Sequence, residues 1–205
     1  MDINWYTCQM VRLNAKELRN SSFVKSLKDK TKNELTKNEI YIVLDNVLDT
    51  YNIGSIFRLA DAVAAKKIYL CAGSETPPNH RIKKASINTT EWVDWEYCGT
   101  AVEAIERIRK FSTRSNKNSS STEPKANGEV QIVSVEQSSK SIPYDKFEYK
   151  MPLALVVGHE SDGVSKEVMD ACDGIVEIPM FGVNISLNVM VSLGIVLYKV
   201  IEKAN

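Results

Sequence analysis

The sequence predicts an α/β fold in which a mainly parallel β-sheet is flanked by helices, and three observations carry this prediction. From residue 40 onward, short apolar runs typical of buried strands recur along the chain. Between them lie segments in which apolar residues follow helical spacing. No internal repeat is visible. Alternation of strands and helices of this kind is typical of an α/β domain with a parallel sheet.

Composition limits the class of protein further. The chain has 205 residues, 43% hydrophobic and 25% charged, with a mean hydropathy of −0.22, which describes a globular chain with one core. Four cysteines are widely spaced, with no CxxC pair or histidine cluster, so neither a zinc site nor a disulfide framework is indicated. The N-terminus lacks a signal-peptide pattern, and no run of about eighteen apolar residues occurs. We therefore expect a cytoplasmic protein that does not enter a membrane.

Charge is uneven along the chain although the total is balanced. Lys and Arg number 26 and Asp and Glu number 26, which excludes a strongly basic chain. Residues 1–40 nevertheless carry a net +3 and residues 66–125 a net +4, whereas residues 126–205 carry −5. This asymmetry predicts positive surface on the front half, where a polyanion could dock. Ordinary solvated surface is the alternative.

The first half of the chain predicts an extension followed by a βαβ unit. Residues 1–39 are polar and lysine-rich with few apolar positions, which indicates an N-terminal helical extension before a domain spanning 40–205. The run IYIVL is then followed by apolar residues at helical spacing and by the run KIYLC. The helical positions are Ile53, Ile56, Phe57, Ala60 and Val63.

The second half predicts further strands and helices. WVDWEYC is a weaker strand candidate, and Thr100 with Glu103 forms a capping-box pattern that opens a helix. QIVSV, LALVV and GIVEI predict three more strands. Residues 112–128 have almost no apolar side chains, which predicts a flexible surface loop; a lid over bound substrate is the less favoured alternative. Residues 187–201 are apolar on nearly every side, so we expect a helix buried all round.

Ligands of open parallel sheets bind beyond the carboxyl ends of the strands, so the loops there are the candidate sites. The first loop, DNVLDTYNIGSIFR, offers Asn52 as a helix N-cap and Gly54 for close backbone approach. Arg58 lies one and a half turns into the following helix among apolar neighbours. An arginine there is either a buried ion-pair partner or an anion binder.

Two later loops carry the other polar candidates. The loop GHESDG lacks the phosphate-binding and dinucleotide-binding glycine patterns. Its Gly158 allows a planar ligand to lie against the backbone, while Glu160 has three candidate roles: capping, holding Arg58 or contacting substrate. In IPMFGVNISLN, Ser186 is the expected N-cap and Asn188 needs a polar partner. Together with Asn52, these residues form either a structural network or a set that orients a ribose.

Three segments resemble, in order and spacing, the motifs of the SpoU/TrmH family of RNA 2′-O-ribose methyltransferases in the SPOUT superfamily. They are DNVLDTYNIGSIFRLADA, LVVGHESDGVS and IPMFGVNISLNVMVSLGIVLY, and the similarity runs from Ile40 to the C-terminus. The resemblance implies an α/β fold with a C-terminal deep trefoil knot, an exception to ordinary chain connectivity. It also implies S-adenosylmethionine as cofactor, RNA as partner, no metal, and a homodimer that packs the knotted regions together.

The resemblance also implies roles for particular residues. Arg58 takes the place of the catalytic arginine, supported by Asn52, Glu160, Ser186 and Asn188. The cofactor contacts are expected at Val135, Glu136, Gly158, Ile178, Met180 and Leu187. Because a guanidinium is effectively always protonated, we expect Arg58 to act as a charge-assisted donor on a phosphate and on the developing alkoxide rather than as a base.

The sequence departs from the family pattern at four positions and leaves the substrate open. His159, Phe181, Met190 and Lys199 differ from the residue types expected there. The short segment before the core favours a tRNA substrate slightly over rRNA. A non-catalytic RNA-binding protein and a domain that binds another adenosine-containing ligand are the alternatives.

Overall fold

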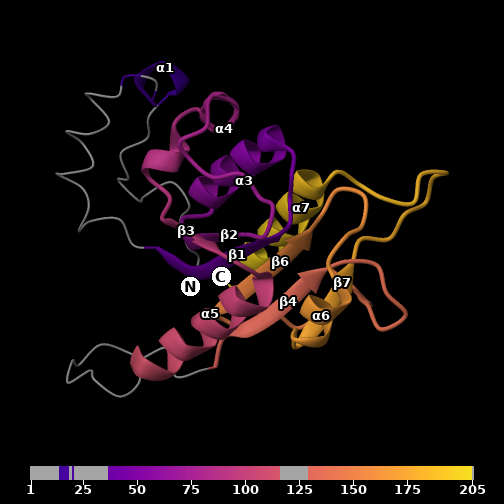
Figure 1. Cartoon of the computed structure of the whole chain (residues 1–205). Coiled ribbons are helices and arrows are strands. Elements are labelled where there is room, and N and C mark those ends of the chain that lie inside the picture. Colours follow the sequence, from indigo (N-terminus) through magenta and orange to yellow (C-terminus); the bar gives the residue numbers. More distant parts are fainter. Residues whose placement is uncertain (1–13, 19, 21–36, 116–128, 205) are drawn as a thin grey trace.

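The structure, a computed structural model, describes residues 14–18, 20, 37–115 and 129–204. Seven strands form one sheet in the order β3-β2-β1-β6-β4-β7-β5, and every pairing is parallel (Figure 1). The strands are β1 (Asn38–Asp45), β2 (Ala65–Cys71), β3 (Trp95–Cys98), β4 (Gln131–Val135), β5 (Ile142–Pro143), β6 (Leu153–Gly158) and β7 (Gly174–Glu177). The predicted fold class, an α/β protein with a parallel sheet, is confirmed.

Helices cover both faces of the sheet. On one face, α3 and α7 pack over the central strands, and on the other face lie α5 and α6 (Figure 1). The short helix α4 packs on α3 rather than on the sheet. The helices of the described residues are α1 (Ala15–Leu18), α3 (Thr50–Ala62), α4 (His80–Ser86), the 3-10 turn η1 (Thr89–Glu91), α5 (Ala101–Ser115), α6 (Lys166–Asp170) and α7 (Val189–Ala204).

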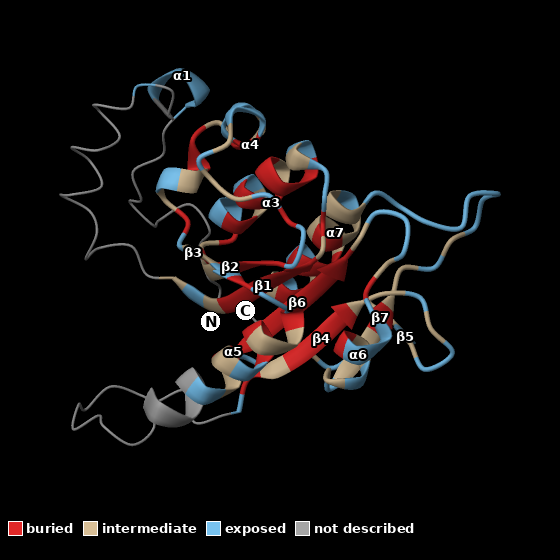
Figure 2. Ribbon diagram, viewed as in Figure 1, coloured by how far each residue is buried: buried red, intermediate tan, exposed pale blue. Residues whose placement is uncertain are grey.

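The central strand β1 shows why an unbroken apolar run folds as it does here. Ile40, Ile42 and Leu44 face the α3 and α7 side, whereas Tyr41 and Val43 face α5. Successive side chains of a strand point to opposite faces, so a strand covered on both faces needs apolar residues at every position. Figure 2 shows the result, a sheet in which the central strands β1 and β6 are buried over most or all of their length.

The strand order reverses direction beside β1. From β1 the chain builds β2 and β3 toward one edge, while β6, β4, β7 and β5 occupy the other side. At the carboxyl ends of the neighbouring strands β1 and β6, Asp45 of β1 is in register with Gly158 of β6. The crevice outside such a reversal is where open parallel sheets bind ligands.

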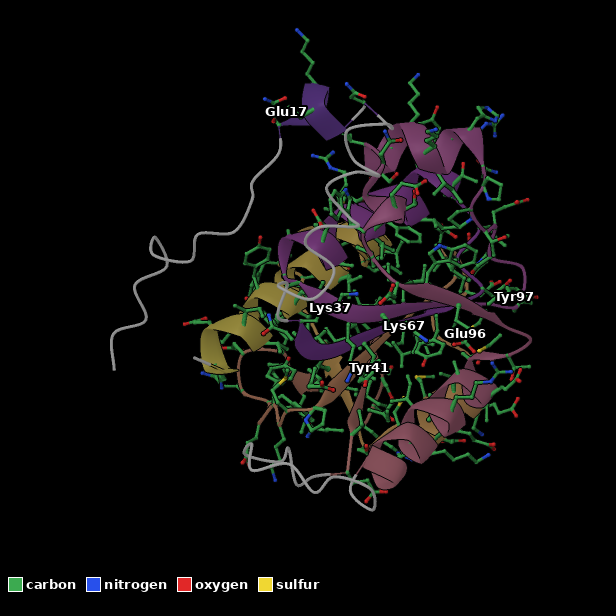
Figure 3. The ribbon with its side chains drawn as sticks, turned by 90° about the vertical axis from the view of Figure 1, so that its left-hand side faces the viewer. Glu17, Lys37, Tyr41, Lys67, Glu96 and Tyr97 are labelled. Atoms are coloured by element: carbon green, nitrogen blue, oxygen red, sulfur yellow. The ribbon has the colours of Figure 1, made fainter. Side chains whose placement is uncertain are left out.

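An ion-pair network joins the β3 edge to helix α5. Glu96 of β3 contacts Lys67 of β2 at 3.1 Å and also accepts a hydrogen bond from Arg107 of α5 (Figure 3). Burial alone would raise the pKa of Glu96, but its hydrogen bonds with Lys67 and Arg107 lower it.

At the start of α5, the Glu103 backbone donates to the Thr100 hydroxyl at 3.1 Å, so Thr100 caps the helix as predicted.

Several predicted boundaries were wrong. Helix α5 continues to Ser115, so the first four positions of the predicted loop 112–128 are helical, and 116–128 lie outside the described residues. The sheet begins at Asn38 rather than at residue 40. Most of the predicted extension 1–39 is also outside the described residues. In addition, α4, α6 and β5 were not predicted, because each is too short to show a full hydrophobic period.

Helix α7 is not buried all round, contrary to the prediction. Leu193, Val196, Leu197 and Val200 face the core, but Val191 and Tyr198 are exposed. The apolar character on its outer side is therefore not used in packing within the described chain. Among the described residues, no helix is both long and apolar enough to cross a membrane.

Candidate active site

The second and third predicted loops line one cavity at the carboxyl edge of the sheet. Its volume is about 490 Å³. The lining includes all six residues expected to contact a cofactor, Val135, Glu136, Gly158, Ile178, Met180 and Leu187, together with Glu160, Ser186 and Asn188. Asn52 and Arg58 are outside the lining, although Asn52 is joined to it by hydrogen bonds.

Two glycines shape the wall of this cavity. A Cβ at Gly158 would lie 2.2 Å from the carbonyl carbon and oxygen of Gly163, so a side chain cannot be placed there without moving the loop. Gly163 has a φ of +69°, and a Cβ there would lie 2.1 Å from Glu136 Oε2. The backbones of His159 and Gly163 exchange two hydrogen bonds of 3.0 and 2.9 Å. The loop after β6 is thus folded back tightly over the end of its own strand.

His159 supports this turn from the inside. Its Nδ1 accepts hydrogen bonds from the backbone N–H groups of Ser161 and Asp162, at 3.1 and 3.2 Å. The Asp162 carboxylate also lies 3.3 Å from Nδ1. The departure from the family pattern at His159 therefore has a structural role, similar to that of an aspartate or asparagine in a turn.

Glu136 connects the end of β4 to the loop after β6. Its carboxylate accepts from the backbone N–H groups of Gln137 at 2.7 Å and Val164 at 2.9 Å. The side chain of Gln137 donates to the carbonyl oxygen of Ile185, so the segment after β7 lies against the segment after β4. Three stretches that are distant in sequence therefore meet around the cavity.

A chain of hydrogen bonds runs from Glu160 through Asn52 to Asn188. Glu160 Oε1 accepts from Asn52 Nδ2 at 3.0 Å, and Asn52 Oδ1 accepts from Asn188 Nδ2 at 3.0 Å. Glu160 also accepts from the backbone N–H groups of Asp49 at 2.9 Å and Leu48 at 3.1 Å. Desolvation raises the pKa of Glu160, but these hydrogen bonds outweigh it and hold the pKa below the ordinary value of 4.5. Of the three roles open for Glu160, the structure supports capping, because its carboxylate accepts from backbone N–H groups at the start of α3, and no ion pair with Arg58 occurs among the described residues.

The two predicted helix caps were each assigned to the wrong residue. Asp49 caps α3 by accepting from the N–H groups of Tyr51 at 2.7 Å and Asn52 at 3.4 Å, so Asn52 lies inside the first turn. Asn188 caps α7 by accepting from Met190 at 2.9 Å and Val191 at 3.4 Å. Ser186 lies in the exposed segment before the helix. Asp49 was detectable, because it directly precedes the helix and aspartate is a strongly preferred N-cap residue.

Arg58 is exposed on the outer side of α3, and no residue in the described ranges forms an ion pair with it. The alternative of a buried ion-pair partner is therefore not supported. Gly54, expected to let the backbone approach a ligand, instead lies against α4. A Cβ at Gly54 would lie 2.6 Å from Ala85 Cβ and 2.7 Å from the carbonyl oxygen of Ile82. The glycine allows α3 and α4 to pack in direct backbone contact.

The segment that leads from β7 to α7 projects away from the sheet as an exposed arm (Figure 2). Phe181, Val183 and Ile185 are 97%, 102% and 77% exposed. Apolar side chains that are scattered singly on a surface are ordinary, but three in one arm form a patch. This arm borders the cavity through Met180 and Leu187.

An open parallel sheet with a cavity beyond the carboxyl ends of β6, β4 and β7, walled by glycines and amide groups, defines an α/β ligand-binding protein of the doubly wound class. The sequence profile of the SpoU rRNA Methylase family matches residues 39–198. The chain belongs to this family.

Individual relatives are distant. The tRNA (guanosine(18)-2′-O)-methyltransferase of Aquifex aeolicus is 29% identical over 168 residues, which cover 81% of this chain and 70% of that protein. The TrmH-family protein YacO of Bacillus subtilis is 29% identical over 176 residues, covering 86% of this chain, but the match spans only 64% of the Bacillus protein.

Solved structures show the same fold. The A. aeolicus TrmH/SpoU tRNA modifying enzyme aligns with a TM-score of 0.67 at 26% identity, covering 90% of this chain and 85% of that one. The SpoU methyltransferase AviRb of Streptomyces viridochromogenes, in complex with AdoMet, aligns with a TM-score of 0.69 at 20% identity, covering 83% of this chain and 60% of that one. At 20% identity, the likeness to AviRb shows the fold alone.

Proposed function

We propose that this chain transfers a methyl group from S-adenosylmethionine to a ribose 2′-hydroxyl of RNA. The observation that carries the proposal is the cavity beyond the carboxyl ends of β6, β4 and β7. It gathers the six expected cofactor contacts, and the link from Glu160 through Asn52 to Asn188 begins and ends in its wall. Family membership supplies the reaction class, and the cavity supplies a place for it.

The residues around the cavity fit such a cofactor. A volume of about 490 Å³ lies within the range that holds small-molecule ligands. Gly158 leaves the backbone bare where a Cβ would collide with Gly163, so a flat ring can approach the main chain. We propose Val135, Glu136, Gly158, Ile178, Met180 and Leu187 as the residues that hold the cofactor. When bound, the cofactor supplies an electrophilic methyl group on sulfur.

Arg58 is the proposed catalytic residue. A guanidinium keeps its proton near neutral pH, so it serves as a donor that clamps the phosphate next to the target ribose and stabilises negative charge on the 2′-oxygen. Its exposure and its lack of a described ion-pair partner leave it available to an incoming anion. Alignment of the two substrates also contributes to catalysis, because correct positioning alone lowers the activation barrier by several kcal/mol.

Glu160, Asn52 and Asn188 are proposed as positioning residues. Both Glu160 oxygens already accept hydrogen bonds, and its pKa is lowered, so the group is ionised and occupied rather than poised to take a proton near neutral pH. Its place at the start of α3 orients the helix that carries Arg58. We include Ser186 on the cavity wall as a contact to the bound ribose.

We further propose a homodimer in which the C-terminal regions pack together, with the deep trefoil knot that the resemblance implies. The exposed apolar side chains of the 181–185 arm and of α7, including Tyr198, support such an interface. The contact from Gln137 to Ile185 and the approach of Lys203 to the carbonyl oxygen of Phe147, at 3.4 Å, support close passage of the C-terminal segment by the β4–β6 connection.

We propose a tRNA substrate ahead of rRNA, and a cytoplasmic location. The relative from A. aeolicus, which is matched over 70% of its own length, is a tRNA methyltransferase. Cys71, Cys98 and Cys172 are free in the structure, which suits a reducing compartment.

The experiment that tests this function maps ribose methylation in total RNA from strains with and without the gene. We expect one 2′-O-methyl mark, in tRNA, to disappear with the gene and to return with the wild-type copy but not with Arg58→Ala. Titration calorimetry with S-adenosylmethionine tests the cofactor separately. No heat of binding together with an unchanged methylation map would favour a non-catalytic RNA-binding protein.

A further inference from the structure

The outer side of helix α4 carries three cations. Its apolar side, with Ile82 buried and Ala85 against Gly54, packs on α3. The opposite side carries Arg81, Lys83 and Lys84, all exposed. Arg81 and Lys84, three residues apart, lie on neighbouring positions of one surface. Lys83 is exposed on the same side, away from the buried Ile82 and Ser86. We call these three cations the α4 basic face.

The cations of the α4 basic face differ from several lysines on β2 and α5. Lysines on β2 and α5 lie within 3.2 Å of carboxylates, as Lys66 does with Glu39, Lys67 with Glu96 and Lys110 with Glu106. Within the described ranges, no carboxylate forms a salt bridge with any of the three α4 cations. Adjacent like charges on one helix repel each other, and a bound polyanion relieves that repulsion.

The position of α4 relative to Arg58 follows from the packing of α3. Gly54 of α3 touches α4, while Leu59 of α3 lies 3.5 Å from the Cβ position of Gly194 in α7. Helical geometry places Tyr51 and Arg58, seven residues apart, on the strip of α3 between these two contacts. Both are exposed, and Figure 1 shows α3 lying between α4 and α7. A strand of nucleic acid that reaches Arg58 along this strip therefore runs beside the α4 basic face.

We propose that the α4 basic face docks the phosphate backbone of the substrate RNA on the nucleotides that flank the target. The proposal rests on the proposed function for the identity of the polyanion. Three cations that form no salt bridge with a described residue lie on one side of a strip whose floor carries the proposed catalytic arginine, and their charge matches that of a phosphate backbone. The face contributes binding and register rather than chemistry, and it does not touch the cofactor cavity.

The test measures RNA affinity without relying on turnover. Fluorescently labelled bulk tRNA is titrated with the wild-type chain and with the triple variant Arg81→Gln/Lys83→Gln/Lys84→Gln, over a series of salt concentrations. Each phosphate contact contributes about 0.7 to the slope of log affinity against log salt for single strands, so the loss of three lowers the slope by about 2. We expect affinity at low salt to fall by about tenfold or more, with S-adenosylmethionine affinity unchanged.

A matched variant controls for the loss of charge. Lys140→Gln/Lys146→Gln/Lys150→Gln removes the same number of exposed cations from the β4–β6 connection, at the other end of the sheet. We expect its tRNA affinity and salt slope to match the wild type. The charge-conserving variant Arg81→Lys should also bind normally. If the triple variant does not fold, the three single Gln variants should each lower the slope by about 0.7.

The outcomes separate this proposal from the proposed function. Equal salt slopes for the α4 variant and the control variant overturn the docking face even if the wild type methylates RNA. A slope that depends on α4, in a wild-type chain that transfers no methyl group, keeps the docking face and overturns the methyltransferase. A wild-type chain that binds neither bulk tRNA nor bulk rRNA at low salt overturns both.

Discussion

The side-chain amide of Asn188 donates to the side-chain oxygen of Asn52 at 3.0 Å, joining residues that are 136 positions apart. Asn188 caps α7, and Asn52 lies in the first turn of α3, so a single amide pair ties the starts of both helices together. Because Asn52 also donates to Glu160, the same pair reaches the loop after β6. Each asparagine uses its oxygen and its nitrogen at once, which fixes the orientation of both amides.

This link predicts energetic coupling between the two asparagines. Asn52→Ala and Asn188→Ala should each lower the free energy of unfolding by about 1–2 kcal/mol, because a part-buried amide loses its partner. The double variant should cost less than the sum of the two, with a coupling of about 0.5–1.5 kcal/mol. Urea denaturation of the wild type and the three variants measures this. Strict additivity would show that the bond contributes nothing.

The lowered pKa of Glu160 predicts a pH-dependent contribution to stability. The carboxylate is favoured in the folded chain, so its contribution is complete above the unfolded pKa and is lost as the pH falls through the lower folded value. Glu160→Gln should therefore reduce the free energy of unfolding by about 1 kcal/mol at neutral pH. The difference from wild type should close in acid.

Denaturant titrations at neutral pH and at several acidic pH values check this, with the exposed Glu148→Gln as control. The same variant tests the proposed role in catalysis. If Glu160 only positions α3, the rate profile should show no group near neutrality that disappears in Glu160→Gln. Such a group would assign the proton transfer to this carboxylate.

The close approach of Gly158 to Gly163 predicts a sharp contrast among glycines. A Cβ at Gly158 would overlap the Gly163 backbone, so Gly158→Ala should destabilise the chain by about 1–3 kcal/mol and abolish cofactor binding. Gly182→Ala is the matched control, because a Cβ there meets nothing within 4 Å. Thermal denaturation and calorimetry with S-adenosylmethionine compare them. Normal cofactor affinity in Gly158→Ala would show that Gly158 does not form part of the cofactor site.

The exposure of Arg58 outside the cavity predicts that substrate chemistry and cofactor binding can be separated. Arg58→Ala should lower turnover by about 10²-fold or more, because the donor for developing charge is lost. Arg58→Lys should keep measurable activity, since a charge and a donor remain. Both variants should bind S-adenosylmethionine as the wild type does. A parallel loss of cofactor affinity in Arg58→Ala would contradict the assignment.

Local patterns were sufficient to predict the strands that are buried on both faces, and the helices α3, α5 and α7. Ile40, Ile42 and Leu44 alternate with Tyr41 and Val43 on the two faces of β1. The run of consecutive apolar residues therefore predicts burial of both faces. Short elements such as α4 were not predicted. Seven residues cover only two helical turns, and only Ile82 among its side chains marks an apolar side strongly.

Three of the polar residues expected at the candidate site are joined by hydrogen bonds, but their individual contacts differ from those predicted. Glu160, Asn52 and Asn188 do come together, yet the caps of α3 and α7 are Asp49 and Asn188 rather than Asn52 and Ser186. Several neighbouring side chains of the same chemical type can cap a helix. Which of them does so depends on where the chain enters the helix.

By itself, the sequence determined which segments are strands, which loops carry the polar groups and which family the motifs resemble, because all of these are properties of neighbouring residues. Only the tertiary structure decided that the Glu160 carboxylate accepts hydrogen bonds from the backbone N–H groups of Leu48 and Asp49, which are 112 and 111 positions away. It also decided that α4, with its basic face, packs against Gly54 of α3, the helix that carries Arg58. Contacts of this kind depend on the order of strands in the sheet and on the packing of helices over it, which no local pattern contains.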